Sequence, residues 1–111
     1  MRLPNGGHAV VEIKKLQDYC LSKAHPHGRH KARVFESALG LTAGHAEVLR
    51  EALLYAARTA EGAQPGEEDD HGMRFVLDFP MTGVARSATV RSGWIVRQGE
   101  DFPRLTTCFV L

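Results

Sequence analysis

The sequence has few cysteines, no long apolar run and almost no net charge, and each shortage excludes something. Two cysteines among 111 residues allow at most one disulfide, and free buried thiols are the commoner state for such a pair. No apolar run approaches the roughly 20 residues that a membrane-spanning helix needs. A net charge of +1 argues against a protein coated in positive charge.

The composition is enough for one folded domain. A chain of 111 residues can bury a modest single core, so we expect one domain over residues 1–111. An apolar fraction of 43% is ordinary for a globular chain and argues against disorder. The opening residues 1–13 lack the apolar core of a signal peptide, which predicts a cytoplasmic protein with no membrane association.

Helical periodicity dominates the first sixty residues. Apolar residues at helical spacing predict about three helices, at 12–21, 30–39 and 43–60. Gly40 fits the position just after the second helix, and Thr42 fits the N-cap of the third. Residues 8–11 form either a short strand or an extended lead-in to the first helix.

The periodicity changes to two after an exposed acidic loop at 61–72. Alternating apolar residues predict three strands, at Met73–Met81, Ala88–Gln98 and Arg104–Leu111. In the last of these, Leu105, Thr107, Phe109 and Leu111 are expected on one face. The short connections predict an antiparallel meander. The sequence therefore predicts an α+β fold in which N-terminal helices pack on one face of a C-terminal antiparallel sheet.

Positive charge gathers in one stretch around the start of the second helix. Residues 19–35 contain no acidic side chain, but they contain four basic residues and three histidines. Backbone N–H groups at a helix start add to such a field, so a phosphate site is expected there. A solvated basic loop is the alternative. Residues 79–99 are also free of acid and carry three arginines, whereas residues 66–70 are acidic.

Three short motifs support a family resemblance. They are Lys31–Phe35, Thr89–Val96 and Pro103–Thr107. The pattern resembles bacterial toxins of the barnase–EndoU–colicin–RelE superfamily. It is most similar to a domain-of-unknown-function family found beside small antitoxin-like proteins. The resemblance implies helices followed by an antiparallel sheet, metal-independent cleavage of RNA, and a neutralising protein partner, as in a toxin–antitoxin or toxin–immunity pair.

Metal-independent cleavage of RNA uses the 2′-hydroxyl of the substrate as the nucleophile. The protein must supply proton transfer and cations for the phosphate. We expect His30 to transfer protons, Lys31 and Arg91 to hold the phosphate, and Thr107 to donate to a phosphoryl oxygen. Lys31 is therefore expected within reach of Arg91 and Thr107. Further candidates for substrate binding are Arg29, Arg33, Ser92, Arg97 and Arg104.

Two alternatives stay open. His25, His27 and His30 suggest zinc, but four converging ligands are not evident, so we expect neither a metal nor another cofactor. The second alternative is a noncatalytic module that binds an acidic partner through the same basic surface. The expected enzyme acts on RNA, with tRNA as one candidate, and its neutralising antitoxin or immunity protein is expected to be acidic.

Overall fold

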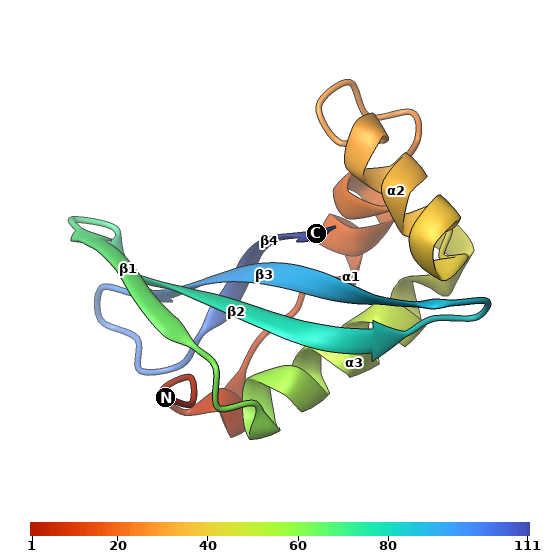
Figure 1. Cartoon of the computed structure of the whole chain (residues 1–111). Helices are drawn as coiled ribbons and strands as arrows, with labels where there is room; N and C mark the ends of the chain where they lie inside the picture. The colour runs from red at the N-terminus through yellow and green to blue at the C-terminus, as the bar shows by residue number, and fades with distance from the viewer.

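The computed structural model describes all 111 residues and has the predicted α+β architecture (Figure 1). The helical elements are η1 (Gly6–His8), α1 (Ile13–Lys15), η2 (Leu16–Cys20), α2 (Arg29–Leu39), η3 (Ala43–His45) and α3 (Ala46–Thr59). The strands are β1 (Gln64–Asp69), β2 (Gly72–Thr82), β3 (Ser87–Arg97) and β4 (Arg104–Val110). All neighbouring strands pair antiparallel in the order β1-β2-β3-β4, which confirms the predicted meander. No helix is both long and apolar enough to span a membrane.

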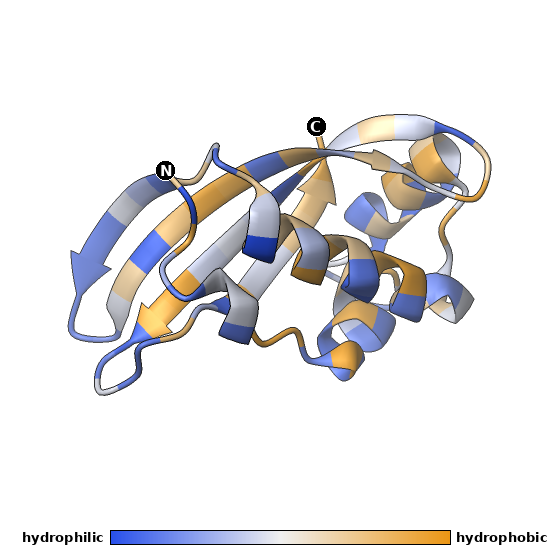
Figure 2. Cartoon of the chain, turned by 90° about the horizontal axis from the view of Figure 1, so that it is seen from below, coloured by the Kyte–Doolittle hydropathy of each residue, from blue (hydrophilic) through white to orange (hydrophobic).

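The acidic segment predicted as a loop is in fact the edge strand β1, so that prediction was wrong. Pro65 pairs with Phe75 of β2, and the register shifts between Pro65 and Glu68. All six β1 residues are exposed, and Figure 2 shows this strand as strongly hydrophilic. A strand with neither face buried carries no apolar alternation, so pattern reading misses it. Proline, charge and a register irregularity are common features of edge strands.

The first predicted helix is split into two kinds of helix. The α-helical turn α1 passes into η2, a π-helix in which the Leu21 N–H donates to the Leu16 carbonyl at 2.9 Å. Leu16 and Cys20 are fully buried, so the predicted apolar side still faces the core. π-Helical turns are rare and frequently occur at functional sites.

The ends of the later helices follow the predicted capping chemistry. Gly40 ends α2 with φ of 72°, and its N–H donates to the Glu36 carbonyl at 2.8 Å. Thr42 is the N-cap of η3, the short turn that leads into α3, rather than of α3 directly. Its N–H donates to His45 Nδ1 at 3.0 Å. Thus His45, to which the sequence assigned no role, helps to cap the third helical segment.

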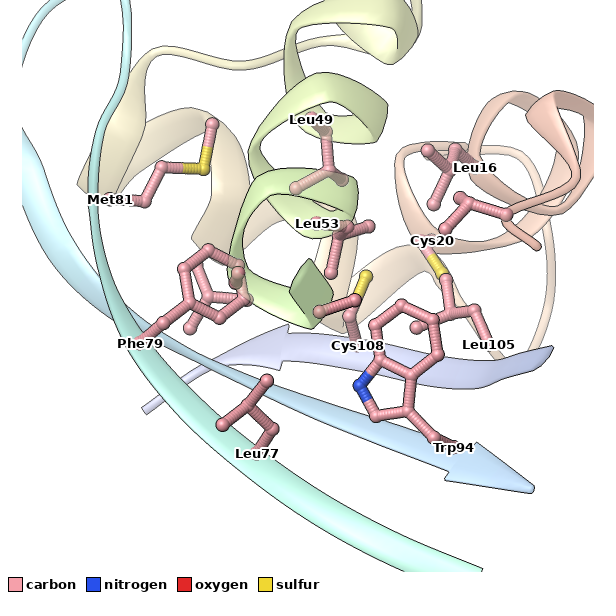
Figure 3. Packing of buried hydrophobic residues seen from close by; sticks show 14 of the residues in the cluster. Leu16, Cys20, Leu49, Leu53, Leu77, Phe79, Met81, Trp94, Leu105 and Cys108 are labelled. Carbon is pink, nitrogen blue, oxygen red and sulfur yellow. The ribbon is translucent and has the colours of Figure 1, made fainter. Parts of the chain in front are cut away.

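The core lies between the sheet and the helices. Leu49 and Leu53 of α3 belong to the same buried cluster as Leu77 and Phe79 of β2, and Trp94 of β3 lies beside Leu105 and Cys108 of β4 (Figure 3). Both cysteines are free and completely buried, as expected for the commoner state. A hydrogen bond from the Cys108 thiol lowers the pKa of Cys20 and raises that of Cys108.

The predicted face of β4 was wrong because the strand contains a bulge. Gly93 pairs with Thr107, but Trp94 pairs with Leu105, so Thr106 has no partner of its own on β3. The extra residue reverses the alternation. Leu105 and Cys108 therefore both face the core, while Thr107 is only partly buried.

Candidate functional site

The arginines of the sheet surface are mostly neutralised by neighbouring carboxylates. Arg91 holds the two oxygens of Asp78, its partner in register, at 2.8 and 2.9 Å. This hydrogen bonding lowers the pKa of the Asp78 carboxyl. Arg104 holds Glu100 in the same way, at 2.9 and 3.0 Å. The expected phosphate-binding stripe on the sheet therefore has its guanidinium forks already occupied by carboxylates.

Of the remaining candidates on β3, one is buried and one is exposed. The Ser92 hydroxyl donates to the Leu77 carbonyl at 2.7 Å and accepts from Trp94 Nε1 at 2.8 Å. With no exposed surface, Ser92 is out of reach of any substrate, and its expected binding role is wrong. Arg97 is exposed and forms no ion pair.

The basic residues expected on α2 are divided between an exposed side and a half-buried position. Arg29, His30 and Arg33 are exposed, and neither arginine has an ion-pair partner. Lys31 is half-buried, with its ammonium 4.9 Å from the ring centre of Phe109 and 6.0 Å from that of Tyr19. Neighbouring helical positions point about 100° apart, which separates His30 from Lys31.

Lys31 reaches the part of the sheet where the sequence placed its partners. Phe109, beneath the ammonium, is the register partner of Arg91 and lies two residues from Thr107. Paired residues on antiparallel strands share a face, so Lys31 lies on the side of the sheet that Arg91 occupies. Direct contact of Lys31 with Arg91 or Thr107 stays a prediction.

The largest cavity includes Tyr19, the aromatic residue near Lys31, in its wall and lies where α1 and η2 approach β4. Its volume is about 450 Å³, and it is open to solvent. The lining residues are Glu12, Lys14, Lys15, Asp18, Tyr19, His25, Thr106 and Thr107. The ammonium of Lys15 donates to the Thr106 carbonyl at 3.4 Å across the cavity. Charged groups of both signs therefore meet at one opening.

Thr107, one of the lining residues, carries a polar atom in an unusual state. Its Oγ1 is buried and has no hydrogen-bond partner. Most buried polar atoms in proteins are paired, and an unpaired one calls for an explanation such as local strain or a catalytic role. The β4 bulge produces the placement, because it turns Thr107 away from the core that Cys108 enters.

His25 is the histidine that lines the cavity, whereas the sequence suggested it only as a zinc ligand. Its Nδ1 accepts the N–H groups of His27 and Gly28 at 3.0 and 3.1 Å. The neutral ring must then carry its proton on Nε2, which makes that atom a donor. The ring edge lies against Tyr19, with centroids 4.7 Å apart. The signal available was the Pro–His–Gly turn after His25, whose N–H groups fold back onto a preceding side chain.

His25 and His27 lie near each other, with ring centroids 5.9 Å apart. Neither joins a set of three or more histidine, cysteine or acidic side chains placed to hold a metal. The groups of the candidate site that can act on a ligand are therefore the lining lysines, Thr107 and His25.

Fold and cavity together define a small α+β domain whose mixed-charge opening lies between an N-terminal π-helix and the last strand of an antiparallel sheet. The chain belongs to the family described as Domain of unknown function (DUF6883), whose model matches residues 2–111. This assignment agrees with the resemblance to a domain-of-unknown-function family. Membership of the broader toxin superfamily stays a prediction.

A solved structure shares the fold. It is described as a contact-dependent growth inhibition toxin–immunity protein complex from Klebsiella pneumoniae 342. The TM-score is 0.70 at 19% sequence identity, and the match covers 92% of this chain and 99% of the other. At this identity the likeness concerns the fold alone. No curated protein matches the sequence.

Proposed function

We propose that this protein is a toxin that cleaves RNA without a metal ion, at the cavity between η2 and β4. The observation that carries the proposal is that Thr107, whose Oγ1 is buried and has no hydrogen-bond partner, lines the same cavity as Lys15 and His25. Lys31, whose ammonium lies 6.0 Å from the ring centre of the cavity-lining Tyr19, can donate to a phosphoryl oxygen together with the Thr107 hydroxyl. The fold shared with a chain of a toxin–immunity complex supports the toxin role.

The cleavage step divides the work among four side chains. The 2′-hydroxyl attacks the adjacent phosphorus, the bond to the 5′ oxygen breaks, and a cyclic phosphate forms as one proton leaves the nucleophile and another reaches the leaving group. Lys31 and Thr107 stabilise the charge that builds on the phosphoryl oxygens. His25 donates through Nε2 to the same group, since its Nδ1 is already occupied. His30 keeps the proton-transfer role, because its ring is exposed and histidine is the commonest general acid and base.

Cleavage of a defined tRNA in the presence of EDTA tests this proposal. Thr107→Val should lower the rate about 100-fold, because removing one donor to a developing oxyanion typically costs that much. The exposed neighbour Thr106 supplies the matched control, and Thr106→Val should change the rate less than about 3-fold. Lys31→Ala should lose activity, whereas Arg58→Ala, which removes one positive charge from α3, should retain most of it.

The outcomes separate the enzyme from its alternative. Loss of cleavage on addition of EDTA would contradict a metal-independent mechanism. A folded protein that binds an acidic partner but cleaves no RNA would instead be the noncatalytic binding module. His30→Ala and His25→Ala should both impair cleavage. Full activity of either variant would remove that histidine from the mechanism.

An acidic antitoxin or immunity protein is the neutralising partner that the charges favour. Lys14 and Lys15 in the cavity lining have no carboxylate partner, and neither do Arg29, Lys31 and Arg33 on α2. Association should therefore slow as salt rises from about 20 to 500 mM, because exposed charges are screened beyond about 8 Å at physiological ionic strength. Arg33→Ala should flatten the salt profile, whereas Arg2→Ala, at a residue paired with Glu61, should not. A flat profile for the parent would exclude charge-led inhibition.

A further inference from the structure

The cavity is larger and chemically more varied than a phosphate alone requires. Its volume of about 450 Å³ lies in the range of small-molecule pockets. The Tyr19 ring forms part of the wall, with His25 against it edge to face. Aromatic walls are the usual means by which proteins hold unstacked bases of single-stranded RNA. A nucleobase is therefore a suitable occupant next to a phosphate.

The carboxylates in the lining indicate what the occupant must offer. A carboxylate repels a phosphate and accepts hydrogen bonds, so it favours a ligand group that donates them. The pKa of Arg104 is raised chiefly by its hydrogen bond with Glu100, and the charge of Glu12 adds to this effect. Asp18 forms no ion pair, although it lines the same cavity as Lys14 and Lys15. Asp18 is thus a lining carboxylate whose oxygens are not held by a salt bridge.

A lysine lines the same cavity as this acceptor. Lys15, at the end of α1, and Asp18, in η2, are both lining residues. Lys15 also reaches the Thr106 carbonyl at 3.4 Å, which holds its ammonium over the cavity. The cavity therefore offers a two-oxygen acceptor next to a cationic donor.

Among the four RNA bases, guanine matches this pair best. Its Watson–Crick edge carries two adjacent donors, N1–H and the 2-amino group, followed by the O6 acceptor. A carboxylate accepts both donors, and an ammonium donates to O6. Adenine and cytosine each offer one donor beside an acceptor, and the single donor of uracil lies between two acceptors.

We propose that this cavity binds guanine, with Asp18 accepting from N1–H and the 2-amino group and Lys15 donating to O6. Tyr19 supplies the flat wall against the base. The inference rests on the proposed function, because it takes the neighbouring phosphate to be the one at which RNA is cleaved. It makes Asp18 a specificity-determining residue that selects the nucleotide next to the cleaved bond.

Calorimetric titration of the full chain with the four 3′-nucleoside monophosphates tests the inference without any cleavage. The guanine nucleotide should bind at least about tenfold more tightly than the others, as expected for one good bidentate contact. Inosine 3′-monophosphate lacks the 2-amino group and should lose most of that advantage. Asp18→Asn should abolish the preference. Asp70→Asn removes the same charge from the exposed β1–β2 turn and should preserve it.

The outcomes distinguish this inference from the proposed function. Equal binding of all four nucleotides, or a guanine preference that survives Asp18→Asn, would overturn guanine recognition, even if RNA is still cleaved in EDTA. Guanine-selective binding by a protein that cleaves no RNA would overturn the nuclease and leave recognition standing. Thr107→Val should lose cleavage while keeping the guanine preference. This one variant therefore separates the nuclease activity from guanine recognition.

Discussion

Replacing Ser92 with alanine should destabilise the fold without affecting chemistry. The Ser92 hydroxyl is completely buried and connects the Leu77 carbonyl to the indole N–H of Trp94. Alanine leaves that N–H buried without an acceptor, which costs about 2 kcal/mol. For 111 residues, the entropy of unfolding converts each kcal/mol into about 4 °C, so Tm should fall by about 8 °C.

A double-mutant cycle identifies the source of this loss. Trp94→Phe removes the N–H but keeps an aromatic ring in the core, so no donor is left unpaired. In that background Ser92→Ala should cost about 1 kcal/mol less than in the parent. Urea unfolding followed by far-UV circular dichroism suits all four proteins, because Trp94 is the only tryptophan and fluorescence would be lost with it.

Two results would refute the reasoning. Equal losses of stability in both backgrounds would mean that the hydroxyl does not satisfy the indole. Loss of RNA cleavage by a Ser92→Ala protein that is still folded would return Ser92 to the substrate site. Cleavage per folded molecule should instead stay within about twofold of the parent, since the side chain faces the core.

Three further substitutions test the fold and its charges. Gly40→Ala should lower the free energy of unfolding in urea by about 1–2 kcal/mol, because φ is 72° and a new Cβ would lie 2.9 Å from a valine methyl. The control Gly62→Ala, with open space around it, should lower it by less than about 0.5 kcal/mol. His45→Ala should cost about 1 kcal/mol through loss of the cap, measured the same way. The hydrogen bond from Arg91 lowers the pKa of Asp78 below the ordinary aspartate value of 3.8. The pair therefore stabilises the fold fully at pH values above 3.8, and this stabilisation is lost as the pH falls through the lowered pKa. Arg91→Ala should therefore lower Tm near neutrality and make its decline toward pH 2 shallower; an unchanged acid profile would contradict this.

Local chemistry made much of the fold predictable. The three long strands show apolar alternation, because one face of each is buried. Gly40 marked the end of α2, because only a residue without a Cβ readily adopts its positive φ. Strand β1 was missed because its stability comes from backbone pairing with β2, which leaves no trace in side-chain polarity.

The sequence by itself determined the fold class and the gathering of positive charge near α2, because periodicity and composition act over neighbouring residues. Only the tertiary structure decided which of these charges are free. Arg91 meets Asp78 through strand register, and His25 meets Tyr19 through a turn. Thr107 faces away from the core because of one extra residue in β4. Such contacts depend on pairing between distant segments, and a bulge shifts the register at little cost without a local signal in the sequence.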